Sequence, residues 1–291
     1  MARAAVAAGP FTERRDRTVE LRGRYAFARE LLDFYGALLA VQEQAYEEAT
    51  SARPAAGDLV PYVAEMVVPA VVNVSIAAGP PKLRDAVALR LETTDPREFV
   101  AAWIGDDDQQ VVDRFLARAS VGPVLEALGS EVAASCIGVR DDRHCPSCGA
   151  PPQLSYFALA PEDLAAGRRF LLCARCHHSW GYARMTCAGC GENSGSRLPI
   201  FSEEGTASGE RGSVVRGLQG KLGDQIAGDH QPIFPHIRIE ACDSCHRYLL
   251  NIDLAADPTA VPLVDELAAL PLDLYATERG FSKIIPNLMG F

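Results

Sequence analysis

Apolar side chains recur every three or four residues through most of the first 140 positions, a spacing typical of amphipathic helices. The pattern that starts at Leu21 continues to Leu39 and predicts one long helix. Further helices are predicted from about residue 58, over residues 82–93, from residue 96, and over residues 109–119 and 123–136. Pro69 predicts a kink in the helix that starts near residue 58, and Asp95 followed by Pro96 is a helix start signal. The first half is therefore predicted to be all-helical.

Beyond residue 140 the pattern changes to short apolar or alternating runs separated by turn residues. The apolar run 170–172 leads into Cys173, and the alternating run 237–240 leads into Cys242, so each predicts a strand that delivers a cysteine-bearing turn. Residues 205–229 contain seven glycines, many polar residues and no periodicity, and they predict a flexible insertion. A last helix is predicted from Asp257, ending before Pro271. These elements together indicate an α+β fold.

Composition and charge narrow the function. The chain is 48% hydrophobic, enough to bury a core, and its net charge of −10 argues against a nucleic-acid binder and against docking on an anionic membrane. The most apolar stretch, residues 66–78, is broken by Pro69 and Asn73 and is too short for a bilayer, so no membrane insertion is expected. The N-terminus lacks the pattern of a leader, which predicts a cytoplasmic protein. The acidic run 106–108 is interpreted as a solvated cap.

Eight of the nine cysteines form four CxxC pairs, and all eight lie in the second half. They are Cys145 and Cys148, Cys173 and Cys176, Cys187 and Cys190, and Cys242 and Cys245. Two thiolates three positions apart on a tight turn can occupy two corners of a tetrahedron around one ion, and two such turns complete the shell. The residue after the second cysteine of each pair must tolerate positive φ, and it is Gly149, His177, Gly191 and His246 in turn.

The order glycine, histidine, glycine, histidine repeats along the chain and favours sequential pairing. The first site would then use Cys145, Cys148, Cys173 and Cys176, and the second Cys187, Cys190, Cys242 and Cys245, although interleaved pairing stays open. A thioredoxin-like dithiol accounts poorly for four pairs, and Cys136 is interpreted as a core residue. Histidines and arginines beside the turns are expected to offset thiolate charge. Because no catalytic triad, paired-carboxylate arrangement or phosphate-binding loop is evident, no catalytic or organic-cofactor residues are predicted.

The order and spacing of these motifs resemble the FdhE family of formate dehydrogenase accessory proteins. The resemblance covers roughly residues 145–291 and rests on four CxxC motifs and on the sequence that follows them. These motifs are Cys145-Pro146-Ser147-Cys148-Gly149, Cys173-Ala174-Arg175-Cys176 with Trp180 beyond it, Cys187-Ala188-Gly189-Cys190, Cys242-Asp243-Ser244-Cys245 with Tyr248-Leu249, and Asp265-Glu266-Leu267-Ala268. The chain departs from the family in a longer insertion before Cys242 and in Leu250, where many members have lysine.

The resemblance implies a fold and a function. The fold is an N-terminal all-helical domain (1–140), two rubredoxin-like, zinc-ribbon-type metal modules (141–186, and 187–256 with the 205–229 insertion), and a C-terminal helix and tail (257–291). The cofactors are two metal ions, iron or zinc, each held by four cysteines. The function is that of a cytoplasmic maturation factor that binds the catalytic subunit of a formate dehydrogenase before export, with a redox role if the metal is iron. Two alternatives stay open: a zinc-ribbon module that binds nucleic acid or another protein, and a small electron-transfer enzyme.

Overall fold

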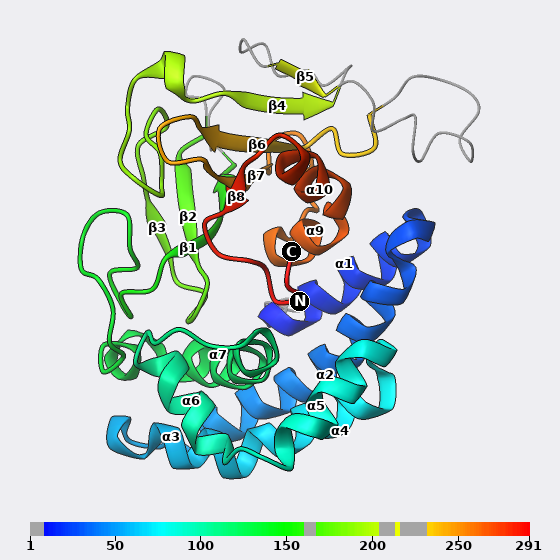
Figure 1. The fold of residues 1–291 in the computed structure, drawn as a ribbon, viewed down its shortest axis with the longest axis vertical. Helices are drawn as coiled ribbons and strands as arrows, with labels where there is room; N and C mark the ends of the chain where they lie inside the picture. The colour runs from blue at the N-terminus through cyan, green and yellow to red at the C-terminus, as the bar shows by residue number, and fades with distance from the viewer. Residues whose placement is uncertain (1–8, 160–166, 204–212, 216–231) are drawn as a thin grey trace, which may run out of the picture.

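The computed structural model describes residues 9–159, 167–203, 213–215 and 232–291 (Figure 1). Its first half is helical, as the hydrophobic pattern predicts, and the second half is built around a sheet, so the α+β class is confirmed. The helices of the first half are α1 (Pro10–Arg24), α2 (Arg29–Ala52), α3 (Leu59–Tyr62), α4 (Val68–Ala78), α5 (Pro81–Leu91), α6 (Pro96–Ile104) and α7 (Val111–Ala133), with short 3₁₀ turns at Ala26–Ala28 and Ala56–Asp58. Asp95 caps α6 as predicted, since its side chain accepts a hydrogen bond from the backbone N–H of Arg97.

The predicted long helix from residue 21 to residue 39 is wrong, because the chain turns at Tyr25. Tyr25 has extended backbone angles (φ −116°, ψ 94°), and α1 ends before it. Its ring is buried against Phe234, with the ring centroids 5.1 Å apart, and its hydroxyl donates to the carbonyl of Ile233. A contact with the second half thus sets the break, and periodicity within the first half cannot reveal it.

The predicted gap between helices at residues 119–123 is also wrong, because α7 runs through Pro123. Proline has no N–H to donate to the carbonyl of Ala119, four residues earlier. That carbonyl instead accepts a hydrogen bond of 3.0 Å from the side-chain amide of Gln42, which lies on α2. The regular helix is interrupted later, at Gly129, where φ is 72° and ψ is −164°.

Replacing Gln42 by leucine should therefore destabilise the helical half by about 1–3 kcal/mol, because it leaves a buried carbonyl without a donor. The measurement is the midpoint of urea unfolding, followed by circular dichroism. Gln44→Leu is the matched control, since Gln44 lies on the exposed side of the same helix and bonds only to Glu48 among the described residues. Equal effects of the two substitutions would show that the Ala119 carbonyl does not depend on Gln42.

The expectation that no segment is long enough to cross a membrane needs correction. The helical run Ala56–Ala78 is 23 residues long and apolar enough to span by length and composition, and 44% of its most apolar window is buried. Pro69 does not end this run: the π-helical turn Val63–Val67 precedes α4, which has the proline in its first turn. The buried face of α4, which includes Val68, Val71 and Val72, belongs to the core of the helical half.

The second half contains one sheet to which both predicted metal modules contribute. Its strands are β1 (Pro152–Phe157), β2 (Arg169–Cys173), β3 (Ser179–Gly181), β4 (Ile200–Glu203), β5 (Ser213–Val215), β6 (Ile237–Cys242), β7 (Arg247–Asp253) and β8 (Ser282–Lys283). They lie in the order β3-β2-β1-β7-β6-β4-β5, with β8 beside β7. The two modules meet where β1 pairs in parallel with β7, with Ser155 opposite Asn251. Apart from β5, the predicted 205–229 insertion lies outside the described residues, and the four-part domain division stays a prediction.

The chain after β7 forms two helices, where the sequence predicted one. Helix α9 (Pro262–Ala268) begins later than residue 257, and α10 (Leu270–Glu278) carries Pro271 in its first turn, where a missing N–H costs little. In Figure 1 these helices and the C-terminal segment lie between the sheet and the helical half. Glu266 of α9 is fully buried and pairs with Lys283, 2.7 Å away, while Gln153 of β1 bonds to both Glu266 and Arg118 of α7. This buried polar network ties the sheet to the helical half.

Candidate metal centres

Each of the four CxxC motifs forms a tight turn of the kind that the sequence predicts. The residue after the second cysteine has positive φ in every case, and this prediction is confirmed: 74° at Gly149, 57° at His177, 83° at Gly191 and 55° at His246. Backbone hydrogen bonds from Gly149 to Cys145 and from Gly191 to Cys187, of 2.8 and 2.9 Å, close two of these turns. Strands β2 and β6 end at Cys173 and Cys242, so the sheet delivers one turn to each cluster.

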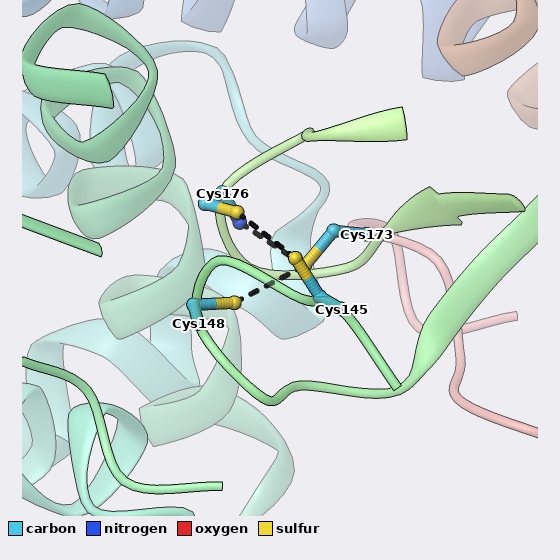
Figure 2. Close-up of side chains that lie close together, drawn as sticks. All are labelled: Cys145, Cys148, Cys173 and Cys176. Atoms are coloured by element: carbon cyan, nitrogen blue, oxygen red, sulfur yellow. Dashed lines mark hydrogen bonds between the residues drawn. The ribbon is translucent and has the colours of Figure 1, made fainter. Parts of the chain in front are cut away.

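The structure groups the eight thiols into two clusters in sequential order. Site 1 is made of Cys145, Cys148, Cys173 and Cys176, and site 2 of Cys187, Cys190, Cys242 and Cys245; within each site all four sulfur atoms lie within 4.8 Å of one another. Figure 2 shows the side chains of site 1 converging from two turns. The closest sulfur pairs are 3.3 and 3.6 Å apart in site 1, and 3.7 and 3.8 Å apart in site 2.

These distances fit a tetrahedral metal ion. Four sulfurs placed 2.3 Å from a central ion lie about 3.8 Å from one another. Backbone N–H groups of Arg175 and Cys176 point at the sulfur of Cys173, at 3.3 and 3.5 Å, as donors to a thiolate do. The donor set of four thiols suits zinc or iron equally. Both clusters can therefore hold a metal ion, while occupancy and the identity of the metal stay predictions.

The pKa values of the thiols in site 1 show why four thiols in contact need a cation beside them. Hydrogen bonding from Cys148 lowers the pKa of Cys145. Burial raises the pKa of Cys173 well above its ordinary value, because the charged thiolate would lie among other sulfurs and out of water. Without a positive ion the cluster cannot carry four negative charges, and with one all four thiols deprotonate. In site 2, burial likewise raises the pKa of Cys245.

The two sites differ in their surroundings. All four cysteines of site 1 are buried, and they belong to the same core as Val121 and Val124 of α7. In site 2, Cys190 is exposed and Cys245 is half-buried. Site 1 thus lies between the sheet and the helical half, whereas site 2 has Cys187 and Cys242 buried and reaches the surface at Cys190.

Residues beside the turns have structural roles. Burial lowers the pKa of His177, although its ring nitrogen lies 3.0 Å from a carboxylate oxygen of Glu126 on α7. Arg175 is buried and pairs with Asp106, at 2.8 Å, so this part of the acidic run 106–108 is more than a solvated cap. Cys136 is buried and lies outside both clusters, which confirms the prediction that it is a core residue.

One further group of potential ligands was not evident from the sequence. His236, Asp257 and Asp265 lie within 4.8 Å of one another. The guanidinium of Arg17 on α1 already pairs with both carboxylates, since it bonds to Asp257 at 2.6 Å and to Asp265 at 2.6 and 3.0 Å. The group is therefore an ion-pair network that joins α1 to the segment around α9. The sequence does not reveal this network, because without the contact with α1, which is remote in sequence, these acidic residues look like those of a helix cap.

The fold and the two clusters define the class of protein: an α+β protein whose helical half packs on a sheet with two four-cysteine centres of zinc-ribbon type. Comparison with known proteins then confirms the predicted resemblance to the FdhE family. Residues 224–289 match the family described as FdhE, C-terminal domain.

The relatives support the same family. A protein FdhE homolog of Aquifex aeolicus is 27% identical over 226 residues, which cover 75% of this chain and 67% of that protein. The protein FdhE homolog of Pseudomonas aeruginosa is 30% identical over 145 residues, which cover 50% of this chain and 38% of that protein. The match therefore spans less than two fifths of the length of the Pseudomonas aeruginosa protein. The crystal structure of the FdhE protein from Pseudomonas aeruginosa has the same fold, with a TM-score of 0.61 over 96% of this chain and 95% of that chain, at 20% identity.

Proposed function

We propose that this protein is a cytoplasmic accessory factor that binds the catalytic subunit of a formate dehydrogenase and is needed for its maturation before export. The observation that carries the proposal is the pair of four-cysteine clusters, together with the family match over residues 224–289. Each CxxC turn is called a knuckle below, and the two knuckles of a site are numbered in chain order. The family match includes the second knuckle of site 2, strand β7 and the helices α9 and α10. The relatives are named protein FdhE homologs, and the FdhE family that this sequence resembles is one of formate dehydrogenase accessory proteins, which supports the choice of client.

The sites favour an accessory role over an enzymatic one. A four-cysteine shell is closed, so it leaves no coordination position for a substrate or for an activated water. When bound, zinc would supply structure alone, and iron would supply one-electron chemistry. In the structural role the thiols of site 1 and site 2 hold the turns in shape for docking. In the redox role the same thiols would place an iron close to the client.

Affinity capture tests the binding step. The tagged full-length chain, expressed in cells that make a formate dehydrogenase, should recover its catalytic subunit from the soluble fraction. The same chain with Cys187→Ser and Cys190→Ser should recover much less, because one knuckle of the surface site loses its metal. Cys136→Ala is the control, since this thiol lies outside both clusters. Capture of nucleic acid in a salt-dependent manner, without the subunit, would favour the zinc-ribbon alternative.

A zinc-loaded protein separates the two roles of the metal. If the sites only fix a docking surface, zinc in place of iron preserves both binding and maturation. If they pass an electron to the client, zinc preserves binding and abolishes maturation.

A further inference from the structure

We propose that the two four-cysteine clusters have different roles. Site 1 holds its metal in place and supports the fold, whereas site 2 can exchange a ligand of its metal for an external one. Soft ligands such as thiolates would reach the metal of site 2 through Cys190. The internal repeat allows this comparison position by position, because each residue of the site 1 turns has a counterpart in the site 2 turns. The counterparts used below are Cys148 and Cys190, Gly149 and Gly191, Arg175 and Ser244, and His177 and His246.

The first contrast is at the first knuckle of each site. Cys148 is 0% exposed, whereas Cys190 is exposed. The segment around Gly138 covers the site 1 knuckle so closely that a Cβ on Gly149 would lie 2.7 Å from the carbonyl carbon of Gly138. At Gly191 the nearest heavy atom to such a Cβ is a side-chain carbon of Arg143, 3.9 Å away. The protein chain therefore buries both cysteines of the first knuckle of site 1, whereas that of site 2 has Cys187 and Ala188 buried and Cys190 exposed.

The second contrast is inside the second knuckle. The guanidinium of Arg175 donates to the carbonyls of Ile137 and Cys148, at 2.8 and 3.2 Å, and so fastens the two turns of site 1 to each other and to the end of the helical half. Its counterpart Ser244 is exposed and bonds to Glu192, at 2.7 Å. Site 2 is held instead by partly exposed contacts, since Arg197 also donates to the Ser244 hydroxyl, at 3.4 Å, and Arg143 donates to the carbonyl of Gly189, at 3.0 Å. The arginine anchor of site 1 is buried.

The third contrast is the histidine that ends each second knuckle. His177 packs against α7, where a Cβ on Gly122 would lie 3.2 Å from its ring, and it bonds to Glu126. His246 is exposed, and its ring lies 6.3 Å from that of Phe281, centroid to centroid. Opening the second knuckle of site 1 would therefore disturb α7, whereas the exposed histidine of site 2 has no such contact with a helix of the first half among the described residues.

A surface cavity also adjoins site 2. Its volume is about 640 Å³, and it lies between the two sites: Gly191, which follows Cys190, lines it, and so does Pro146 of the site 1 turn, whose cysteines are buried. An incoming ligand can approach the exposed knuckle from this side. In the exchange step, an incoming thiol would release its proton and replace the sulfur of Cys190 on the metal, and Cys190 would leave as a thiolate and take up one proton. One proton is released and one is taken up, so the charge balances and no electron is transferred.

Metal-release kinetics of the full-length protein test the proposal. The chain is loaded with two equivalents of zinc, and 4-(2-pyridylazo)resorcinol is added as a coloured chelator, with and without glutathione. One equivalent should leave at least about tenfold faster than the other, a ratio within the range by which surrounding contacts change metal affinity. Glutathione should accelerate only the fast phase. In Cys190→Ser the fast phase should disappear, and the remaining equivalent should leave at the slow rate.

Alkylation of the unmodified protein makes the test independent of any variant. With iodoacetamide present during release, mass spectrometry should find the thiols of site 2 modified in the fast phase and those of site 1 in the slow phase. Equal release rates, a fast phase that survives in Cys190→Ser, or earlier alkylation of site 1 would each overturn the proposal. Because none of these measurements involves a formate dehydrogenase, failure of the proposed function would leave the result unaffected.

Discussion

Replacing Cys145 and Cys148 by serine should remove at least one metal equivalent and unfold both halves of the protein. The four thiols of site 1 lie in the same core as α7, and the site anchors the turns that Arg175 joins to the helical half. A structural metal site of this kind contributes on the order of 10 kcal/mol. That is comparable with the whole stability of a typical domain, about 5–15 kcal/mol. The expected readout is loss of the helical signal in circular dichroism, together with a metal content of about one equivalent or less.

The matched variant for this prediction is Cys187→Ser with Cys190→Ser. It removes the same two knuckle positions from site 2, and it should also lose one equivalent of metal. Because site 2 lies at the surface, most of the helical signal should remain, with a lower midpoint of unfolding. If the site 1 variant kept a native helical signal, the cluster would not be part of the core that supports the helices. If either variant kept both metals, the sequential grouping of the ligands would be wrong.

The ligand turns could be predicted because their geometry is local. A CxxC pair and the residue after it determine a knuckle within five positions, and the repeated glycine-histidine order indicates which knuckles go together. The unequal burial of the two sites could not be predicted, since it depends on segments that are remote from the turns. Gly138 over Gly149, and α7 against His177, are contacts that no spacing in the sequence reveals.

The helical half shows the same division between local and remote causes. The cap at Asp95 was predicted, because it depends on the neighbouring backbone. The break at Tyr25 and the unbroken passage through Pro123 were missed. The first is set by packing against Phe234, and the second by the amide of Gln42, which replaces the missing donor. The single sheet was missed for a related reason, since the parallel pairing of β1 with β7 joins strands almost a hundred residues apart in the chain.

Deleting the gene in a strain that depends on a formate dehydrogenase should leave the catalytic polypeptide at its normal level but inactive. The reason is that a maturation factor acts on the catalytic polypeptide after it has been synthesised and does not affect its synthesis. The measurements are formate-dependent dye reduction in cell extracts and an immunoblot of the catalytic subunit. The wild-type gene and the Cys136→Ala variant should restore activity, because that thiol lies outside both clusters.

The cluster variants then connect the activity to the sites. Cys190→Ser should restore little activity while the protein stays folded, since it alters the exposed knuckle and leaves the buried centre intact. A zinc-loaded wild-type protein, added to extracts of the deletion strain, distinguishes a docking role from electron transfer, since only the second requires a redox-active ion. Full formate dehydrogenase activity in the deletion strain, with no second copy of the factor, would refute the maturation role. It would leave the two four-cysteine centres to be explained by another client.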